Sequence, residues 1–327
     1  MKKWIAIILV VIFAAYGGVS FYFSNKLFFP PLMGDEELKA EYGTISPEEV
    51  ELTVEEVSFP ARDNGFSGIN GFDDKVNIHA WWIEAKVKSK AKAKVKGTDT
   101  PKRAFILVHG RNSNKKALIR FASLFVSKGI STLLIDLRGH GESTDNFVTF
   151  GDKERYDVMG AVDYLSTKGY GPDDKIGLLG LSMGATSSFL ATMDLNIEKD
   201  GSVDVLIFDS GIPDVPASIV FNSKKAVGDA VPFLLPGALV MARLRSGANF
   251  KDGNPIAHTD DINIPILFVI HEMDELIPYD EQKNLFEEYP GPKQILEFEG
   301  LGHHRGHVEK RAEYEDAVNK FLKQFNF

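Results

Sequence analysis

The stretch from residue 176 to residue 191, IGLLGLSMGATSSFLA, constrains the fold of this chain more than any other. An apolar run ends in Gly180-Leu181-Ser182-Met183-Gly184, and a segment suited to a helix follows. This order predicts a strand, a sharp turn and a helix, with Ser182 at the apex of the turn. Glycine is expected on both sides of the apex, because a Cβ there would crowd a strained backbone.

The same stretch predicts a chemical role for Ser182. A serine at such an apex projects its hydroxyl over the end of the sheet, and the first backbone N–H groups of the following helix point at the same space. The pattern Gly-x-Ser-x-Gly between a strand and a helix is typical of a nucleophile elbow. The alternative is an ordinary strand-to-helix turn in which Ser182 is only the helix N-cap.

Composition limits the classes of protein that this chain can belong to. Its 327 residues, 44% hydrophobic and 25% charged, suit a folded chain with one large domain or two small ones. A net charge of −9 and the lack of a basic face interleaved with aromatic residues argue against a nucleic-acid partner. The absence of cysteine excludes disulfides, thiolate metal sites and a cysteine nucleophile.

Residues 1–29 are predicted to be a transmembrane anchor or a signal segment. The run from Trp4 to Phe23 is uncharged and mostly apolar, and as a helix it would be about 30 Å long, enough to cross a bilayer core. A cleaved signal peptide is the alternative, since Ile5–Ala15 resembles its apolar region. The longer run and the missing A-x-A site favour the anchor. Two lysines before the span and one after it favour an extracytoplasmic catalytic body.

Residues 30–327 are predicted to form a single catalytic domain. After a polar connector at 30–50, Val50–Phe59 and Val76–Glu84 have the alternation of strands, separated by a loop at Asn64–Asp74. The lysine-rich tract Ala85–Lys102 is interpreted as a solvated insertion rather than as a patch for membranes or polyanions.

Buried strands then alternate with helices. This alternation predicts a largely parallel sheet with helices on both faces, in which ligands bind at the carboxyl ends of the strands. A proline-rich stretch at about residues 212–260 interrupts it and is expected to be a small, mostly helical insertion. The further strands are expected at 104–108, 131–137, 203–208, 264–270 and 294–298, and the further helices at 115–128, 154–167, 280–288 and 308–325.

Two residues at strand ends can activate Ser182, because a serine hydroxyl needs a base and the base needs an orienting carboxylate. Asp274 follows the strand at 264–270, and His303 follows the strand at 294–298. The chain order Ser, Asp, His is the one expected for an elbow serine on an open α/β sheet. Asp209, which also ends a strand, is the rival carboxylate.

Two other histidines close to His303 in the sequence are alternative bases. His303 is favoured over His304 and His307 because it directly follows Gly302 in a short glycine-rich turn. These three histidines have a spacing that zinc tolerates, but no carboxylate or thiolate partner accompanies them, so neither a metal nor a cofactor is expected. Three further histidines are expected to be structural or at the surface: His79, His258 and His271.

An acyl-transfer intermediate also needs two backbone donors for its oxyanion. The N–H of Met183, directly after the nucleophile, is the first candidate, and the N–H of Arg111, after the strand at 104–108, is the second. The side chain of Arg111 is alternatively expected to line the pocket. Asp136 and His140 are interpreted as scaffold residues, with Asp136 fixing its turn by hydrogen bonds.

Five segments together resemble the α/β-hydrolase superfamily over roughly residues 50–325: VHGRNSN, LIDLRGHGES, IGLLGLSMGA, FVIHEMDELIP and FEGLGHHR. The resemblance implies an eight-stranded, mostly parallel sheet, a Ser182–Asp274–His303 triad, and a lid at about residues 212–260. More narrowly, the chain is similar to membrane-anchored or secreted bacterial hydrolases of the serine aminopeptidase and esterase-like branch. The lysine-rich insertion, and Arg111 in place of an apolar residue, depart from the family pattern.

We therefore expect a serine hydrolase without a cofactor that cleaves a carboxylic ester through an acyl-enzyme. Its partners would be a small-molecule or lipid ester and a membrane. The alternatives are a peptidase, a lipid-directed lipase or thioesterase at the membrane surface, and a non-catalytic binding protein of the same fold. The apolar lid segments Val231–Leu235 and Ala238–Met241 suit either contact with a membrane or ordinary packing on the sheet.

Overall fold

The computed structural model describes residues 2–62, 75–85, 101–144, 146–198, 203–251 and 253–327. The loop predicted at Asn64–Asp74 and nearly all of the lysine-rich tract Ala85–Lys102 lie outside the described residues.

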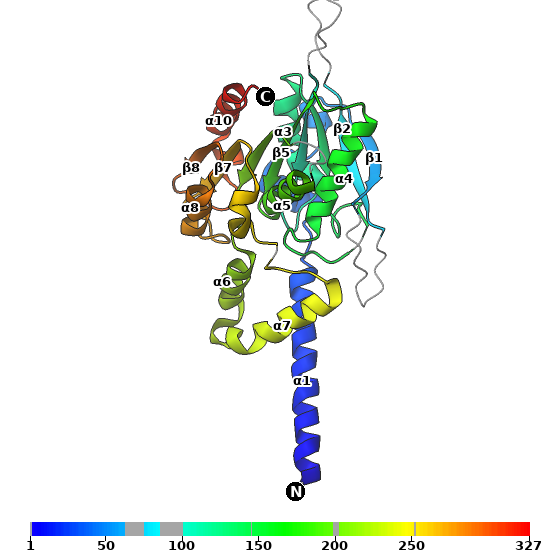
Figure 1. Cartoon of the computed structure of the whole chain (residues 1–327), viewed down its shortest axis with the longest axis vertical. Coiled ribbons are helices and arrows are strands. Elements are labelled where there is room, and N and C mark those ends of the chain that lie inside the picture. The colour runs from blue at the N-terminus through cyan, green and yellow to red at the C-terminus, as the bar shows by residue number, and fades with distance from the viewer. Residues whose placement is uncertain (1, 63–74, 86–100, 145, 199–202, 252) are drawn as a thin grey trace, which may run out of the picture.

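The centre of the molecule is an eight-stranded sheet with the order β1-β2-β4-β3-β5-β6-β7-β8 (Figure 1). The strand β2 is antiparallel to both of its neighbours, and the pairs from β4 to β8 are parallel. The predicted α/β architecture is therefore confirmed. The strands are β1 (Glu55–Pro60), β2 (Asn77–Ile83), β3 (Arg103–Val108), β4 (Ser131–Ile135), β5 (Lys175–Leu181), β6 (Val205–Asp209), β7 (Ile266–His271) and β8 (Lys293–Phe298).

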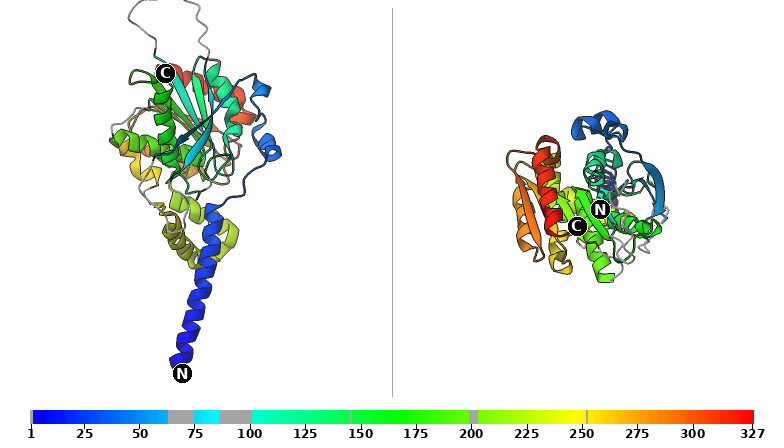
Figure 2. Two further views of the ribbon diagram at one scale, coloured as in Figure 1. Left: turned by 90° about the vertical axis from the view of Figure 1, so that its right-hand side faces the viewer. Right: turned by 90° about the horizontal axis from the view of Figure 1, so that it is seen from above.

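Helices cover both faces of this sheet and make it three layers deep (Figure 2). The strands β4, β6 and β7 are buried along their whole length, which explains their continuous apolar sequences. One face packs against α4 (Glu154–Thr167), α5 (Met183–Glu198) and α8 (Tyr279–Glu288). The other packs against α2 (Asp35–Tyr42), α3 (Ile119–Val126) and α10 (Arg311–Gln324), with α9 (Gly306–Glu309) just before α10.

The connector predicted at 30–50 contains a helix that the sequence analysis did not anticipate. This helix, α2, has eight residues, and only Leu38 and Tyr42 are buried. Two apolar positions are too few to show a helical period, so the segment resembles a polar linker. The first predicted strand also begins later than expected: Glu48–Val50 is a 3₁₀ turn, and β1 starts at Glu55.

The predicted helical insertion lies between β6 and β7 and is called the lid below. It consists of α6 (Val215–Val227), a 3₁₀ turn (Gly228–Ala230), α7 (Val231–Ser246) and a second 3₁₀ turn (Pro255–Asp261). The Asp214 side chain accepts the backbone N–H of Ala217 at 2.8 Å and caps α6. Prolines in the first turns of both α6 and α7 explain why this part of the sequence looked irregular.

The N-terminal segment is one long helix, α1 (Lys2–Phe28), as the sequence predicted. It projects away from the sheet on the side where the lid helices lie, with the N-terminus at its far end (Figure 1). Residues from Lys2 to Tyr16 are exposed, whereas Ser20, Ser24 and Phe28 are buried. The second half of α1 is therefore part of the folded body.

Candidate active site

Ser182 lies at the junction of β5 and α5 in a backbone conformation that few side chains adopt. Its φ angle is 53°, and its N–H donates to the carbonyl oxygen of Asp209 at 2.8 Å. The two glycines around it permit close packing: a Cβ on Gly184 would lie 2.3 Å from the carbonyl oxygen of Val108. The sharp strand-to-helix turn expected from the sequence is present.

The structure brings Ser182, His303 and Asp274 together in hydrogen-bonded order. His303 Nε2 lies 2.8 Å from Ser182 Oγ, and His303 Nδ1 lies 2.7 Å from Asp274 Oδ2. The side chains of His303 and Asp274 are almost fully shielded from solvent. Because Asp274 faces Nδ1, the proton of a neutral imidazole is held there, and Nε2 is free to accept the serine proton.

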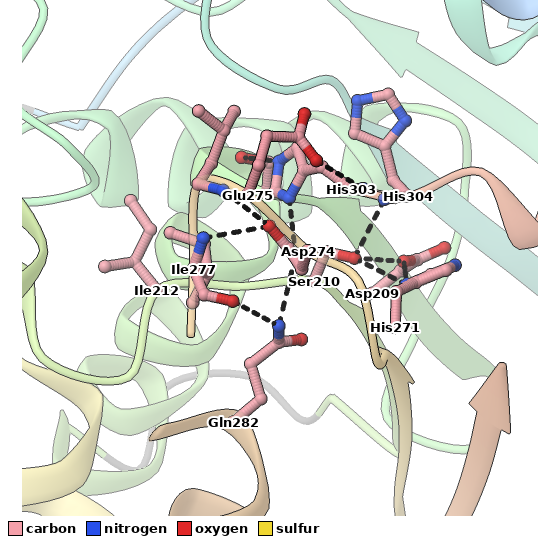
Figure 3. Close-up of polar contacts among 12 residues, drawn as sticks. Asp209, Ser210, Ile212, His271, Asp274, Glu275, Ile277, Gln282, His303 and His304 are labelled. Atoms are coloured by element: carbon pink, nitrogen blue, oxygen red, sulfur yellow. Dashed lines mark hydrogen bonds and ion pairs between the residues drawn. The ribbon is translucent and has the colours of Figure 1, made fainter. Parts of the chain in front are cut away.

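Asp274 accepts hydrogen bonds from other donors besides His303. Its Oδ1 accepts the backbone N–H groups of Leu276 and Ile277, both at 2.9 Å. Its Oδ2 also accepts Nε2 of Gln282 at 3.1 Å, and the same amide donates to the carbonyl oxygen of Ile277 at 2.9 Å (Figure 3). Gln282, on α8, was not singled out by the sequence analysis, and a polar residue in an amphipathic helix gives no signal of this role.

Asp209, the rival carboxylate, is engaged elsewhere. Its Oδ2 accepts the hydroxyl of Tyr314 at 3.0 Å, and its Oδ1 accepts the hydroxyl of Ser210 at 3.1 Å. Burial raises the pKa of Asp209 to about 7. The contacts of its carboxylate thus favour a role beneath the site rather than in it.

Ser210 links this buried carboxylate to His271. His271 Nε2 accepts the N–H of Gly306 at 2.9 Å, so its Nδ1 carries the proton and donates to Ser210 Oγ at 2.9 Å. The same hydroxyl accepts the N–H of His304 at 3.1 Å (Figure 3). Burial lowers the pKa of His271 to about 4. His271 is therefore a neutral residue that fixes the loop carrying His303.

The neighbours of His303 pack against aromatic rings. His304 stacks on Tyr42 with ring centroids 5.4 Å apart, and His307 lies 5.0 Å from the ring of Phe121. Burial lowers the pKa of His307 to about 3 and that of His304 well below the usual range. In the part of the chain that the structure describes, no group of three or more His, Asp or Glu side chains is arranged to hold a metal. His79 and His258 are partly exposed.

The loop after β3 lies directly against the nucleophile. A Cβ on Gly110 would lie 3.2 Å from the Cβ of Ser182. His109 holds the loop, since its Nδ1 is 2.7 Å from the carbonyl oxygen of Gly110 and its Nε2 accepts the N–H of Leu137 at 3.0 Å. The two proposed oxyanion donors, Arg111 and Met183, line the same cavity as Ser182.

The side chain of Arg111 binds the end of α1. Its Nη2 donates to the carbonyl oxygens of Lys26 at 3.2 Å and Leu27 at 2.8 Å, and its guanidinium lies 4.9 Å from the centre of the Phe150 ring. Burial lowers the pKa of Arg111 to about 10. Arg111 was expected near the pocket, but nothing in the surrounding sequence indicates this contact with α1.

The turn after β4 is a scaffold, as expected. Asp136 accepts both the N–H and the Nζ of Lys115, at 2.7 and 2.6 Å, and the N–H of Glu142 at 3.0 Å. His140 Nδ1 lies 2.8 Å from the carbonyl oxygen of Arg138. These contacts hold the turn in place without reaching Ser182.

A cavity of about 940 Å³ extends from Ser182 and His303 into the lid. Polar groups gather at the catalytic end, including Arg111 and Glu275. On the side of the lid and α1 the lining also includes polar residues of α6, namely Ser218, Asn222 and Ser223, and Lys26 of α1. Most of the lining on this side is apolar: Ile219, Leu234, Leu235, Ala238, Phe23 and Leu27. A volume of this size can take a substrate larger than a short-chain ester.

The sheet order, the elbow and the strand-end geometry, together with similar solved structures, give this chain the fold of the α/β-hydrolase superfamily. Within it, the serine aminopeptidase family S33 matches residues 99–252. Among solved structures, an esterase of Pyrococcus furiosus is similar over nearly the whole chain. Its TM-score is 0.63 at 20% identity, and the match covers 90% of this chain and 97% of the other.

Two relatives in sequence and a further solved structure are similar to most of the chain. The uncharacterised protein YqkD of Bacillus subtilis is 28% identical over 70% of this chain and 73% of its own length. The thiohydrolase aneE of Aspergillus aculeatus is 29% identical over 62% of this chain and 78% of its own. The esterase Est1E of Butyrivibrio proteoclasticus, solved with ferulic acid, has a TM-score of 0.53 at 18% identity, covering 81% of this chain and 98% of the other.

Proposed function

We propose that this protein is a serine hydrolase that cleaves a carboxylic ester through an acyl-enzyme intermediate. The observation that carries the proposal is the chain of contacts from Ser182 Oγ to His303 Nε2 at 2.8 Å and from His303 Nδ1 to Asp274 at 2.7 Å. A buried base aimed at a serine and oriented by a carboxylate is the arrangement that nucleophilic acyl transfer requires.

In the first half of the reaction, Ser182 Oγ bonds to the ester carbonyl carbon while its proton moves to His303 Nε2. The N–H groups of Met183 and Arg111 hold the oxyanion of the tetrahedral intermediate. The bond from carbon to the leaving oxygen then breaks, and His303 returns the proton to the departing alcohol. In the second half, His303 takes a proton from water, and the resulting hydroxide attacks the acyl carbon. Ser182 regains its proton as the acid leaves.

Two kinds of support favour an ester over other acyl substrates. Several structural neighbours are esterases, and an ester needs little beyond the nucleophile, base and oxyanion donors. A thioester is the second candidate, because a relative of 29% identity is a thiohydrolase. The same residues would carry out that reaction with a thiol as the leaving group.

We also propose that α1 anchors the enzyme to a membrane with the catalytic body outside the cytoplasm. The helix is long and apolar enough to cross a bilayer, and Val215–Ser246 of the lid passes the same test by composition. That second stretch is broken into α6 and α7, of 13 and 16 residues, each too short to span a bilayer alone.

Labelling of the full-length protein in detergent with a fluorophosphonate tests the proposal. We expect one adduct in the wild type, none in Ser182→Ala, and an unchanged adduct in Ser223→Ala, which removes another serine lining the cavity. The wild type and Ser223→Ala should hydrolyse nitrophenyl butyrate, and Ser182→Ala should not. An adduct that persists in Ser182→Ala, or folded wild-type protein that neither reacts nor hydrolyses the ester, would contradict the proposal.

A further inference from the structure

The membrane-anchor helix is part of the wall of the catalytic cavity. Tyr22, Phe23 and Leu27 of α1 line the cavity that contains Ser182 and His303. On the lid side, the lining is supplied by α6 and α7. A substrate that extends from Ser182 into the cavity therefore contacts α1 as well as the lid.

The helices α1 and α7 pack closely along several turns. The Tyr16 hydroxyl donates to the carbonyl oxygen of Phe233 at 3.0 Å. A Cβ on Gly237 would lie 2.2 Å from the hydroxyl oxygen of Ser20, so the backbone of α7 approaches α1 directly. Small residues allow such close approach between helices in membranes.

Arg245 makes the contacts between α1 and α7 at the C-terminal ends of both helices. Its Nη1 donates to Ser24 Oγ at 2.6 Å and to Asn25 Oδ1 at 2.7 Å, and its guanidinium lies 4.3 Å from the centre of the Phe21 ring. Contacts that follow α1 from Tyr16 to Asn25 follow α7 from Phe233 to Arg245, so the two helices run in the same direction. The start of α7 is therefore the part farthest from the sheet.

The length of α1 places α7 within the depth of a bilayer. The part of α1 that projects freely, Lys2–Ala15, is about 21 Å long, which is short of the roughly 30 Å of a hydrocarbon core. To complete the span, the apolar run must continue to about Phe23. Tyr16–Phe23 is the segment against which α7 packs, so the start of α7 lies at the same depth.

The outer surface of α7 suits that environment. Phe233, Val240 and Leu244 are 75%, 61% and 52% exposed. No charged residue occurs between Val231 and Ala242, and the arginines of α7 lie in its last turn. Apolar side chains exposed on a helix that accompanies a membrane span are expected to contact lipid.

We propose that this enzyme takes long-chain acyl esters directly from the membrane, with α1 and α7 together forming the lipid-embedded entrance to the cavity. The inference rests on the proposed function and names its substrate class. The acyl chain occupies the apolar part of the cavity between α1 and the lid, and its ester carbonyl reaches Ser182. The anchor is then a substrate-binding element, and it is retained in the mature protein.

The position of α7 can be tested because the chain contains no cysteine. We would attach an environment-sensitive NBD fluorophore to Phe233→Cys in the full-length protein in phosphatidylcholine vesicles. Ile197→Cys is the matched control, since Ile197 is 60% exposed and lies at the end of α5 remote from Ser182. We expect doxyl-labelled lipids to quench the label at 233 and aqueous iodide to quench the label at 197.

The substrate class is tested with two probes: monoolein dissolved in the same vesicles and nitrophenyl butyrate in solution. Phe233→Glu should lower monoolein hydrolysis roughly tenfold, because a carboxylate disfavours insertion of α7, and leave butyrate hydrolysis unchanged. Phe233 does not line the cavity, and a glutamate in the first turn of a helix is favourable for its stability. Ile197→Glu should change neither rate, and flotation checks that α1 holds all proteins on the vesicles.

The outcomes separate the two proposals. Butyrate hydrolysis without monoolein hydrolysis, or an NBD label at 233 that only iodide quenches, would overturn this inference and leave the hydrolase assignment intact. Equal monoolein hydrolysis by the wild type and Phe233→Glu would overturn the role of α7. If folded wild-type protein hydrolysed neither monoolein nor nitrophenyl butyrate, both the proposed function and this inference would be wrong.

Discussion

The carboxyl edge of the sheet and the unit formed by α1 and the lid differ in which side chains they bury and which they expose. At the sheet edge, polar groups such as Asp274 and His271 are buried and held by two or more hydrogen bonds each. In the unit of α1 and the lid, large apolar groups such as Phe13 and Phe233 are exposed at 79% and 75%. The first region is built for fixed chemistry in a dry site, and the second for contact with an apolar surrounding. Our two proposals thus assign chemistry and substrate supply to different parts of the chain.

Substitution of the orienting carboxylate should have the largest effect. Asp274→Asn should lower kcat for nitrophenyl butyrate by about a thousandfold or more, because an amide no longer holds His303 in the tautomer that accepts the serine proton. Asp209→Asn is the control and should cost less than about tenfold, since its contacts are with Tyr314 and Ser210. If steady-state kinetics showed a larger loss of kcat for Asp209→Asn than for Asp274→Asn, our assignment of Asp274 as the orienting carboxylate would be wrong.

A disturbance of the packing between α1 and α7 should have an intermediate and substrate-dependent effect. Gly237→Leu puts a side chain where Ser20 and Tyr16 already lie, so monoolein hydrolysis in vesicles should fall about tenfold. Butyrate hydrolysis should change less, because the groups around Ser182 are untouched. Gly17→Leu adds the same side chain to α1 where nothing lies within 4 Å, and it should behave like the wild type. Equal loss for both substrates would contradict the separation of the two regions.

The smallest effect is expected for stability near the catalytic loop. Burial lowers the pKa of His307 to about 3, and Arg120 and Arg305 act in the same direction. The folded protein therefore leaves His307 neutral while the unfolded chain binds a proton, and stability is lost as pH falls below about 6.5. At pH 5 this loss is about 2 kcal/mol.

His307→Phe removes this loss and keeps the contacts with Phe121 and Tyr314. Relative to the wild type, its Tm should rise by about 3 °C more at pH 5 than at pH 8. Thermal unfolding followed by circular dichroism at the two pH values measures this difference. A Tm difference that does not depend on pH would show that His307 is not buried as a neutral residue.

The sequence predicted the sheet edge well because its signals are local. The central strands are short apolar runs, and the elbow and the turn that carries Asp274 follow β5 and β7 closely. The turn that carries His303 follows β8 in the same way. Parallel strands bring these ends to one edge, so order along the chain translates into proximity. The fold and the positions of the three residues could therefore be expected from residues that are close in sequence.

The contacts that complete the site could not be predicted in this way. Arg111 meets the end of α1 over a separation of 84 residues, and Arg245 meets Ser24 over 221. Gln282 reaches Asp274 only because α8 folds back on the loop after β7. Nothing in the sequence near these residues marks the partner, and only the tertiary packing brings it into contact.

The hydrogen bonds from Arg111 to the last carbonyl groups of α1 have a consequence for anyone who reworks this protein. They join α1 to the loop beside Ser182, so the proposed anchor is not an exchangeable tag. A chimaera that carries a foreign transmembrane helix would still reach the membrane but would lose the fit at this joint. Under our proposals, a functional exchange would have to replace α1 and the loop after β3 together.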